Sequence, residues 1–515
     1  MNGAESLVRT LVACGVTTCF ANPGTSEMHF VAAVDEVEGM RTILGLFEGA
    51  VTGMADGYGR MAEAPAATLL HLGPGLANGL ANLHNARRAA TPIVNIVGNH
   101  ATYHEQYDPP LASDVEGFAR PVSGWIHTSP SPLDVASDAA RAVQASLQPP
   151  GQIATLILPA DTAWLDAERP AEPLPTPVPV AVADLAVSQA ARALATGKNT
   201  LILIRGAALK EPGLRAAARV AAKTDARVAC DTFAPRWQRG AGRALVEQIP
   251  YFAEQIVDFM SGVEQLILVG AKPPVSFFAY PGKPSWCTPA DCRILHLAHP
   301  HEDGVGALQA LAEAVGATKE RGSIAALALP DMPGGPLNAI TAAQVIGRLL
   351  PEQAIISDEA STSGIGLNQS TASAAPHDRL ALTGGSIGQG IPVATGAAVA
   401  CPDRKVVCLQ GDGGAMYTLQ ALWTQVRENL DVTTVIFANH SYAILNVELW
   451  RVGVEHPGPK ALSMLDLHNP TLDWQAIGTG IGIDASRATT IEEFADQFGR
   501  AMRERGPRLI EVVLT

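Results

Sequence analysis

The sequence lacks the features of a membrane protein, a secreted protein or a nucleic-acid-binding protein. No uninterrupted apolar run approaches the roughly 20 residues that span a bilayer. The N-terminus has no cationic segment followed by an apolar one, so we expect no signal peptide. Acidic residues outnumber basic ones, 50 to 36, and the net charge of −14 argues against nucleic acid as a partner. We therefore expect a cytoplasmic protein with no membrane and no nucleic-acid partner.

Cysteines and dinucleotide-binding glycines are also sparse. The seven cysteines are scattered and odd in number, which suits reduced, mostly buried thiols rather than a disulfide framework. Cys287 and Cys292 lack the further ligands of a zinc site. No convincing Gly-x-Gly-x-x-Gly follows a β run, which argues against an NAD-dependent oxidoreductase.

Two proline-rich stretches divide the chain. One runs from Glu168 to about Val180, and the other contains Pro330, Pro333 and Pro336. Such segments resist regular structure and suit surface linkers. They predict three domains of ordinary size, at residues 1–167, 183–326 and 338–515.

Each of the three pieces alternates amphipathic helices with short apolar β runs. Because such runs are buried on both faces, they indicate parallel sheets covered by helices on each side. The fold class that we predict is α/β, with three doubly wound parallel-sheet domains. The predicted strands are Thr18–Ala21, Ala67–His71, Ile93–Gly98, Ala154–Pro159, Thr200–Ile204, Arg227–Cys230, Gln265–Val269, Arg293–His296, Ala354–Ser357, Lys405–Leu409, Val432–Ala438 and Arg508–Val513.

The stretch Gly411-Asp412-Gly413-Gly414 is the most informative motif. It follows one predicted strand, and Asn439 follows the next one, after an intervening helix. The glycines allow a tight strand-to-helix turn in which backbone N–H groups approach phosphate oxygens. Asp412 and Asn439 supply oxygen ligands, and the backbone carbonyl near Ser441 supplies a third. Mg²⁺ is usually held by a few protein oxygens together with diphosphate oxygens. An ordinary glycine-rich turn is the alternative, but the full order of elements favours the metal–diphosphate site.

This arrangement resembles the thiamin-diphosphate motif of the pyruvate decarboxylase, acetolactate synthase and benzoylformate decarboxylase superfamily, and benzoylformate decarboxylase has the closest pattern. The resemblance covers essentially the whole chain. It implies Mg²⁺ ligation by Asp412, Asn439 and Ser441. It also implies that Ile387 supports the bent cofactor and that the Gly385 carbonyl accepts a hydrogen bond from the 4′-amino group. The remaining cofactor contacts that it implies are Glu48, Ser361, Thr362, Gly411, Gly413, Gly414, Tyr442, Ala443 and Ile444.

Glu48 is the residue predicted to activate the cofactor. It lies in the apolar segment Leu46–Val51, an unusual setting for a solvated carboxylate. A surface glutamate at the start of a helix is the alternative interpretation. Thiamin-diphosphate chemistry needs one carboxylic acid beside N1′ of the aminopyrimidine, and the resemblance assigns this role to Glu48. A carboxyl group in an apolar pocket keeps its proton more readily and can share it.

The first piece holds further catalytic candidates. Asn22-Pro23-Gly24-Thr25 resembles the family's Asn-Pro-Gly-Ser segment, so Thr25, with Ser26 beside it, is predicted to hydrogen-bond the substrate. His71 precedes Gly73-Pro74-Gly75, where the family has its first active-site histidine, and is predicted to carry protons. A satisfied histidine of the core is the alternative for His71.

The sequence departs from benzoylformate decarboxylase at several positions. Phe277 stands where the family has its second catalytic histidine, and Ile444 stands where a small residue admits a phenyl ring. His100 and His104 are the candidates to replace the missing histidine, with a surface-loop role as the alternative. The paired histidines of pyruvate decarboxylases are absent. The FAD signature of a true acetolactate synthase is not evident, so FAD is not predicted.

The resemblance implies a thiamin-diphosphate- and Mg²⁺-dependent enzyme that acts on a small 2-oxo acid through an enamine, as a decarboxylase or carboligase. Because the family builds each site from two chains, we expect a homodimer at minimum and a homotetramer as the full assembly. One alternative is an acetolactate synthase-like carboligase or C–C lyase without FAD. Another is a non-catalytic cofactor-binding subunit, against which the intact Glu48, Asp412 and Asn439 argue.

Overall fold

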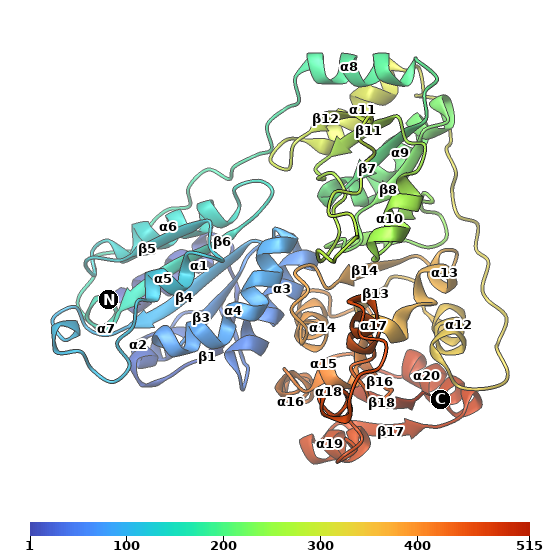
Figure 1. The fold of residues 1–515 in the computed structure, drawn as a ribbon. Helices are drawn as coiled ribbons and strands as arrows, with labels where there is room; N and C mark the ends of the chain where they lie inside the picture. The colour runs from blue at the N-terminus through green and yellow to red at the C-terminus, as the bar shows by residue number, and fades with distance from the viewer. Residues whose placement is uncertain (515) are drawn as a thin grey trace.

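The computed structural model describes residues 1–514, which form three α/β units, each built on its own sheet (Figure 1). The first sheet is entirely parallel, in the order β2-β1-β3-β4-β6-β5. Helices α1 and α6 pack together on one of its faces, and α3 and α4 pack together on the other. Its strands are β1 (Thr18–Asn22), β2 (Arg41–Leu44), β3 (Ala66–Leu70), β4 (Ile93–Asn99), β5 (Trp125–Thr128) and β6 (Ile153–Pro159). Its helices are α1 (Gly3–Ala13), η1 (Thr25–Glu27), α2 (Met28–Glu36), α3 (Glu48–Ala62), α4 (Leu72–Ala89), α5 (Val115–Ala119), α6 (Val135–Ser146) and α7 (Ala160–Trp164).

The second sheet is also parallel and has the order β10-β8-β7-β11-β12. This unit stands above the other two in Figure 1. Its strands are β7 (Thr200–Ile204), β8 (Arg227–Cys230), β10 (Glu247–Gln248), β11 (Gln265–Val269) and β12 (Arg293–Ala298). Its helices are α8 (Asp184–Leu194), α9 (Glu211–Thr224), α10 (Ala253–Met260) and α11 (Gly304–Ala314).

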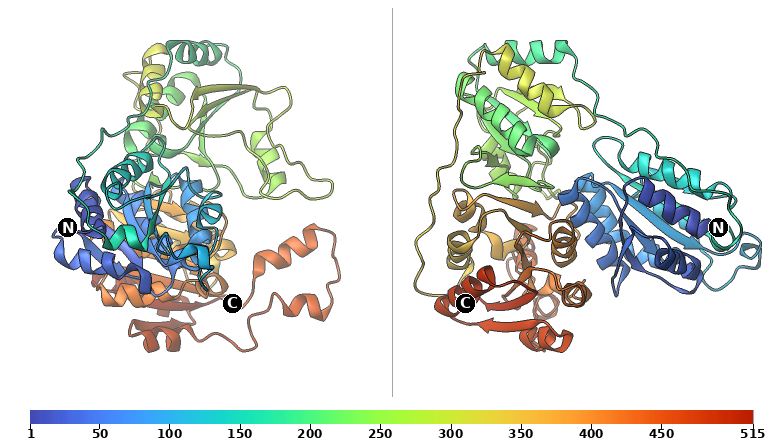
Figure 2. Two further views of the ribbon diagram at one scale, coloured as in Figure 1. Left: turned by 90° about the vertical axis from the view of Figure 1, so that its left-hand side faces the viewer. Right: turned by 180° about the vertical axis from the view of Figure 1, so that it is seen from behind.

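The third sheet has the order β17-β18-β16-β15-β13-β14-β9 and is parallel except for the last pair. Helices α17 and α18 extend away from this sheet (Figure 2). Its strands are β13 (Ala354–Glu359), β14 (His377–Ala381), β15 (Val406–Gly411), β16 (Val432–Ala438), β17 (Asp484–Ala488), β18 (Arg508–Val513) and the antiparallel β9 (Trp237–Arg239). Its helices are α12 (Ala339–Leu349), η4 (Ser361–Gly364), α13 (Leu367–Thr371), α14 (Gly390–Ala400), α15 (Asp412–Ala415), α16 (Gln420–Arg427), α17 (Ala443–Arg451), α18 (Pro459–Ser463), α19 (Trp474–Ile481) and α20 (Ile491–Arg503).

The predicted α/β class with three parallel-dominated sheets is confirmed, and every predicted strand is present with small shifts at its ends. One shift matters for function: β3 ends at Leu70, so His71 is the residue that precedes α4 rather than the last residue of the strand. The strands that the sequence did not predict are β2, β5, β9, β10, β14 and β17. The domain boundaries stay predictions, and β9 shows that residues of the middle piece also join the third sheet.

Helices α3 and α14 join the first unit to the third through glycine contacts. A Cβ atom at Gly57 would lie 2.0 Å from the Val393 carbonyl oxygen, and one at Gly396 would lie 1.8 Å from the Met54 carbonyl oxygen. Because both added Cβ atoms would meet backbone atoms, the two helices would have to move apart to admit either side chain. Glycine is therefore required at this crossing, which lies just after Glu48 on one helix and just after the Gly384–Gly388 segment on the other.

Replacing Gly396 with alanine should lower the free energy of unfolding by at least about 1–3 kcal/mol, the range for overpacking a tight core. The measurement is a denaturant titration that compares the midpoints. Gly480→Ala is the matched control, because Gly480 lies within α19 and has no heavy atom within 4 Å of the added Cβ. That control should raise stability by up to about 1 kcal/mol. Equal effects of the two substitutions would show that the crossing does not constrain the fold.

Within residues 1–514, no helix is both long enough and apolar enough to cross a bilayer.

Candidate active site

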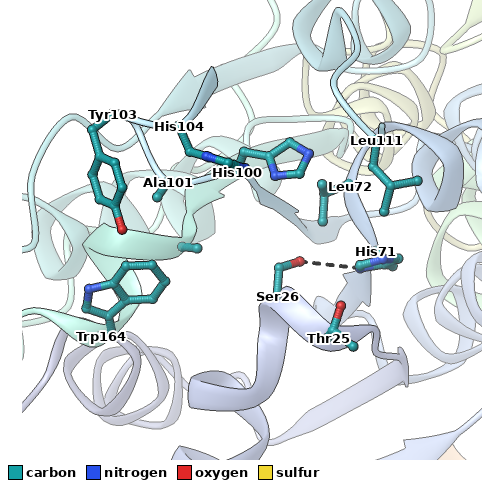
Figure 3. Close-up of a pocket in the computed structure, with 11 residues that line it drawn as sticks. Thr25, Ser26, His71, Leu72, His100, Ala101, Tyr103, His104, Leu111 and Trp164 are labelled. Carbon is teal, nitrogen blue, oxygen red and sulfur yellow. Dashed lines mark hydrogen bonds between the residues drawn. The ribbon is translucent and has the colours of Figure 1, made fainter. Parts of the chain in front are cut away.

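A cavity of about 380 Å³ opens at the carboxyl ends of β3, β4 and β6 (Figure 3). Parallel strands bring the loops that follow them to one edge of a sheet, which is the usual place for a ligand site in this fold class. Five residues predicted to act in catalysis line this cavity, and Glu48 does not. The lining residues are Thr25, Ser26, His71, Leu72, His100, Ala101, Tyr103, His104, Leu111, Ala160 and Trp164.

A buried carboxylate orients His71. Glu27, which is only 3% exposed, places Oε2 2.7 Å from Nδ1 of His71, and the same oxygen accepts from the Gly24 backbone N–H at 2.7 Å. The Ser26 hydroxyl donates to Oε1 of Glu27 at 2.5 Å and lies 3.4 Å from Nδ1 of His71. Since a carboxylate only accepts, the proton between them belongs on Nδ1. The Nε2 atom of His71 is then the nitrogen that can exchange a proton with a ligand.

Glu27 was not among the residues predicted from sequence. The signal was its position three residues after Gly24, where its side chain returns to the Gly24 backbone N–H as in a capping box. Gly98 supplies the room, because a Cβ atom there would lie 1.9 Å from Oε1 of Glu27. Neither fact shows that the carboxylate also reaches a histidine 44 residues later.

His100 and His104 face the same cavity from the loop after β4. Their ring centroids are 5.7 Å apart, and His104 lies against Tyr107. Burial, followed by the neighbouring His104, lowers the pKa of His100 below its usual 6.5. Its Nε2 atom is buried and has no hydrogen-bond partner among residues 1–514. Burial therefore favours the neutral form of His100.

Glu48 begins α3 with its side chain buried at 8% exposure. Its Oε2 atom accepts a hydrogen bond from Nδ2 of Asn78 at 3.0 Å. A Cβ atom at Gly75 would lie 3.1 Å from the other oxygen, Oε1. The neighbouring Asn82 amide joins this region to the third unit, because it donates to the Gly49 carbonyl at 2.8 Å and to that of Gly388 at 3.4 Å. The carboxylate is thus buried but has only one hydrogen-bonding side chain.

The predicted metal ligands lie together at the ends of β15 and β16. Asp412 is 2% exposed, and its oxygens accept from the backbone N–H groups of Gly413 at 2.8 Å and His440 at 2.7 Å. Burial raises the pKa of Asp412 above its usual value. The Asn439 side-chain oxygen accepts from the Ser441 N–H at 3.1 Å. Among the described residues, Asp412 has no lysine or arginine partner, and only Nδ1 of His440 lies within ion-pair distance, at 4.0 Å.

A second buried acid, Glu359, connects the two glycine loops of the third unit. Its oxygens accept from the backbone N–H groups of Gly388 and Gly390, both at 2.6 Å, and from Nε2 of Gln410 at 2.8 Å. Burial raises its pKa, and the side chain is 4% exposed. A Cβ atom at Gly414 would lie 2.7 Å from Oε1 of Glu359. The sequence prediction missed this residue, although an acid at the end of an apolar strand was the available signal.

Phe277 reaches the third unit from the middle one. A Cβ atom at Gly385, whose φ is +75°, would lie 2.7 Å from Cζ of Phe277. The ring also contacts Phe233 and Phe278, with centroids 5.7 and 4.7 Å apart. The phenyl group therefore rests on the residue whose carbonyl was predicted to hold the aminopyrimidine.

Comparison with known proteins identifies the family. The thiamine pyrophosphate enzyme N-terminal TPP-binding domain matches residues 1–121, and the C-terminal TPP-binding domain matches residues 363–512. A putative acetolactate synthase large subunit, IlvX, of Mycobacterium tuberculosis is 54% identical over all of this chain and 99% of its own. The chain belongs to the thiamin-diphosphate-dependent enzymes.

Two further similarities extend over nearly the whole molecule. Benzoylformate decarboxylase of Pseudomonas aeruginosa is 29% identical over 97% of this chain and 96% of its own. The thiamin-diphosphate-dependent 4-hydroxybenzoylformate decarboxylase of Rhodococcus jostii has the same fold, with a TM-score of 0.87 at 22% identity over 100% of this chain and 99% of its own. The protein is therefore an enzyme of the family's lyase and transferase type.

The chemistry of the third unit fits a magnesium ion that carries the diphosphate of this thiamin-diphosphate enzyme. Within the part of the chain that the structure describes, the one ion-pair contact of the buried Asp412 carboxylate is with Nδ1 of His440, 4.0 Å away. Gly411 has open space where a side chain would stand, whereas a Cβ atom at Gly413 would lie 2.5 Å from the Tyr442 ring. Among residues 1–514, no group of three or more His, Cys, Asp or Glu side chains could hold a metal ion.

The other residues predicted to contact the cofactor lie in loops and at helix starts of the same unit. Ser361 is exposed, with φ of +52°, and Thr362 is partly buried beside it in η4. Ile387 is half-buried between Gly385 and Gly388. Tyr442 precedes α17, and the half-buried Ala443 and Ile444 form its first turn.

Proposed function

We propose that this chain is a thiamin-diphosphate- and Mg²⁺-dependent decarboxylase or carboligase of a small 2-oxo acid. The observation that carries the proposal is the cavity in which the oriented His71 faces Thr25 and Ser26. It supplies a proton carrier and hydroxyl donors in the same unit as the buried Glu48. The matching family and the names of its relatives support the same reaction class.

The third unit would hold the cofactor. Asp412, Asn439 and the Ser441 carbonyl would bind Mg²⁺, and the backbone near Gly411 would meet the diphosphate, with Ser361 and Thr362 nearby. Ile387, Gly385, Tyr442, Ala443 and Ile444 would contact its rings. When bound, thiamin diphosphate supplies a nucleophilic carbon that adds to a carbonyl. Its cationic ring accepts the electron pair that CO₂ leaves behind.

The chain's own residues would bind the substrate and move protons. Glu48 would share a proton with the aminopyrimidine of the bound cofactor, and its burial separates this carboxyl group from water. Thr25 and Ser26 would orient the substrate carboxylate, and His71 would exchange a proton at Nε2 with the substrate oxygen or carbon. Glu27 holds Nδ1 of His71 and so fixes which nitrogen faces the ligand.

Replacing Glu27 with glutamine should lower kcat by about 100-fold, the smaller end of a general acid–base contribution. The amide oxygen can still accept from Nδ1 of His71, but the negative charge beside the ring is lost, so the pH profile of kcat should shift as well, whereas KM should change little. The measurement is CO₂ release as a function of pH. Glu38→Gln, at an exposed position of the same unit, is the matched control. An unchanged rate and pH profile in Glu27→Gln would reject the positioning role.

The experiment that tests the proposed function is CO₂ release by protein reconstituted with thiamin diphosphate and Mg²⁺. The substrates run from pyruvate and branched 2-oxo acids to benzoylformate, each with and without a second carbonyl compound. We expect release from one class. If cofactor is bound but no CO₂ appears from any substrate, the proposal fails, and a C–C lyase acting on 2-hydroxy carbonyl compounds replaces it.

A second candidate is an acetolactate synthase-like carboligase without FAD, favoured by the 54% identical relative. Product analysis separates the two functions: an aldehyde alone indicates decarboxylation, and a 2-hydroxy carbonyl product indicates carboligation. We also propose a homodimer at minimum and a homotetramer as the full assembly, in which Glu48 of one chain and Asp412 of another serve one cofactor. Analytical ultracentrifugation with and without cofactor tests the assembly.

A further inference from the structure

We infer that the substrate is a 2-oxo acid whose side chain ends in a second carboxylate, which His100 and His104 recognise. This inference rests on the proposed function and names the substrate class of the same cavity. During decarboxylation the carboxylate beside the carbonyl would leave as CO₂ and one proton would be taken up. The side-chain carboxylate would remain in the aldehyde product.

The cavity is lined by hydrogen-bonding groups and by no acidic side chain. Its lining contains three histidines, two hydroxyl residues, a tyrosine and a tryptophan, but no Asp, Glu, Lys or Arg. The acids near it are already engaged. Glu27 accepts from Gly24 and Ser26 and holds His71, Asp161 accepts from Thr102, and Glu105 accepts from Asn99. Donors without competing acids are the arrangement that binds an anion.

Two separate sets of donors face the cavity. Figure 3 shows Thr25, Ser26 and His71 on one side and His100 and His104 on the opposite side. One 2-oxo acid group can use only the first set, because the reacting carbonyl has to stay near His71. The second set is therefore available to the far end of the substrate. Tyr103 and Trp164 lie at one end of the cavity.

The second set of donors, His100 and His104, also includes a buried atom without a hydrogen-bond partner. Nε2 of His100 is buried without one, and buried polar atoms in folded proteins are nearly always hydrogen-bonded. An apolar side chain would leave Nε2 of His100 unpaired, and sites built for hydrogen bonding discriminate strongly against such analogues. A cationic side chain would meet three imidazoles and no free carboxylate. A carboxylate satisfies the donors and stabilises their protonated forms.

The test compares substrates of equal chain length on the reconstituted holoenzyme. 2-Oxoglutarate and 2-oxopentanoate differ only in the terminal carboxylate, and 5-guanidino-2-oxopentanoate supplies a cationic end. We expect kcat/KM for CO₂ release to be at least about 100-fold higher for 2-oxoglutarate than for either of the others. His100→Asn and His104→Gln should each lower this ratio by about 10-fold or more. His127→Gln, at a histidine paired with Asp138 outside the cavity, should leave the ratio unchanged.

The outcomes separate the two proposals. CO₂ release that favours 2-oxopentanoate would overturn the substrate class and leave the proposed function standing. A ratio that His100→Asn and His104→Gln both preserve would overturn the assigned recognition. If neither acid releases CO₂, calorimetry on the cofactor-loaded protein decides. Tighter binding of 2-oxoglutarate than of 2-oxopentanoate would support dicarboxylate recognition while the decarboxylase proposal fails, and equal or weaker binding would reject both.

Discussion

Glu48→Gln should leave thiamin diphosphate bound and slow the exchange of its C2 proton by about 1000-fold, within the range for loss of a positioned acid–base group. The glutamine amide occupies the same volume, and its oxygen can still accept from Asn78, so the local packing is kept. The amide has no acidic proton to share with the aminopyrimidine. The effect should therefore appear in exchange rate and kcat, with little change in cofactor affinity.

The measurement is hydrogen–deuterium exchange at C2 by proton NMR, together with a cofactor titration. Glu492→Gln provides a matched control, because Glu492 is an exposed glutamate in the first turn of α20, just as Glu48 is a buried one in the first turn of α3. Only the buried position should affect exchange. Normal exchange in Glu48→Gln would remove this residue from the activation step.

The second large effect is expected at the metal site. Asp412→Ala should weaken Mg²⁺-dependent binding of thiamin diphosphate by at least about 100-fold. Loss of a residue that hydrogen-bonds a metal ligand costs about 10–100-fold in metal affinity, and loss of the ligand itself should cost more. Asp412 is the one buried carboxylate among the three predicted ligands, and its oxygens are also held by the backbone of Gly413 and His440. Alanine removes both the charge and these acceptors.

Asp412→Asn separates the two contributions. The amide oxygen still accepts from one backbone N–H, but the negative charge is lost. Because burial disfavours that charge in the metal-free protein, the asparagine variant should unfold at a temperature no lower than the unchanged apoprotein. It should nevertheless lose most Mg²⁺-dependent affinity in calorimetry. Retained affinity in either variant would contradict the assignment of Asp412 as a metal ligand.

The buried strands were predictable because apolar, β-rich runs such as Val432–Ala438 are covered on both faces. Most strands at the sheet edges, and β14 beside one of them, were not, for a physical reason that their residues show. Strand β14 reads His-Asp-Arg-Leu-Ala and β17 reads Asp-Ala-Ser-Arg-Ala, so charge interrupts any apolar pattern. Strand β9 has three residues and exists through its antiparallel pairing with β14, a contact between distant parts of the chain.

The cofactor family could be inferred from short segments because phosphate and metal binding depend on local geometry. Gly411–Gly414 and Asn439 follow two neighbouring parallel strands, so their order along the chain already places them together. The same reasoning identified Glu48 and His71 as candidates, through the segments around them. It did not reveal their hydrogen-bond partners.

Those partners depend on tertiary contacts that no local pattern encodes. Glu27 meets His71 across two loops, Phe277 crosses from the middle unit to Gly385, and His100 comes to face the cavity of His71. Each contact joins side chains from separate loops, and their positions follow from how the strands and units pack. The sequence thus specifies which cofactor this enzyme uses, whereas the packing of its loops determines which donors surround the substrate.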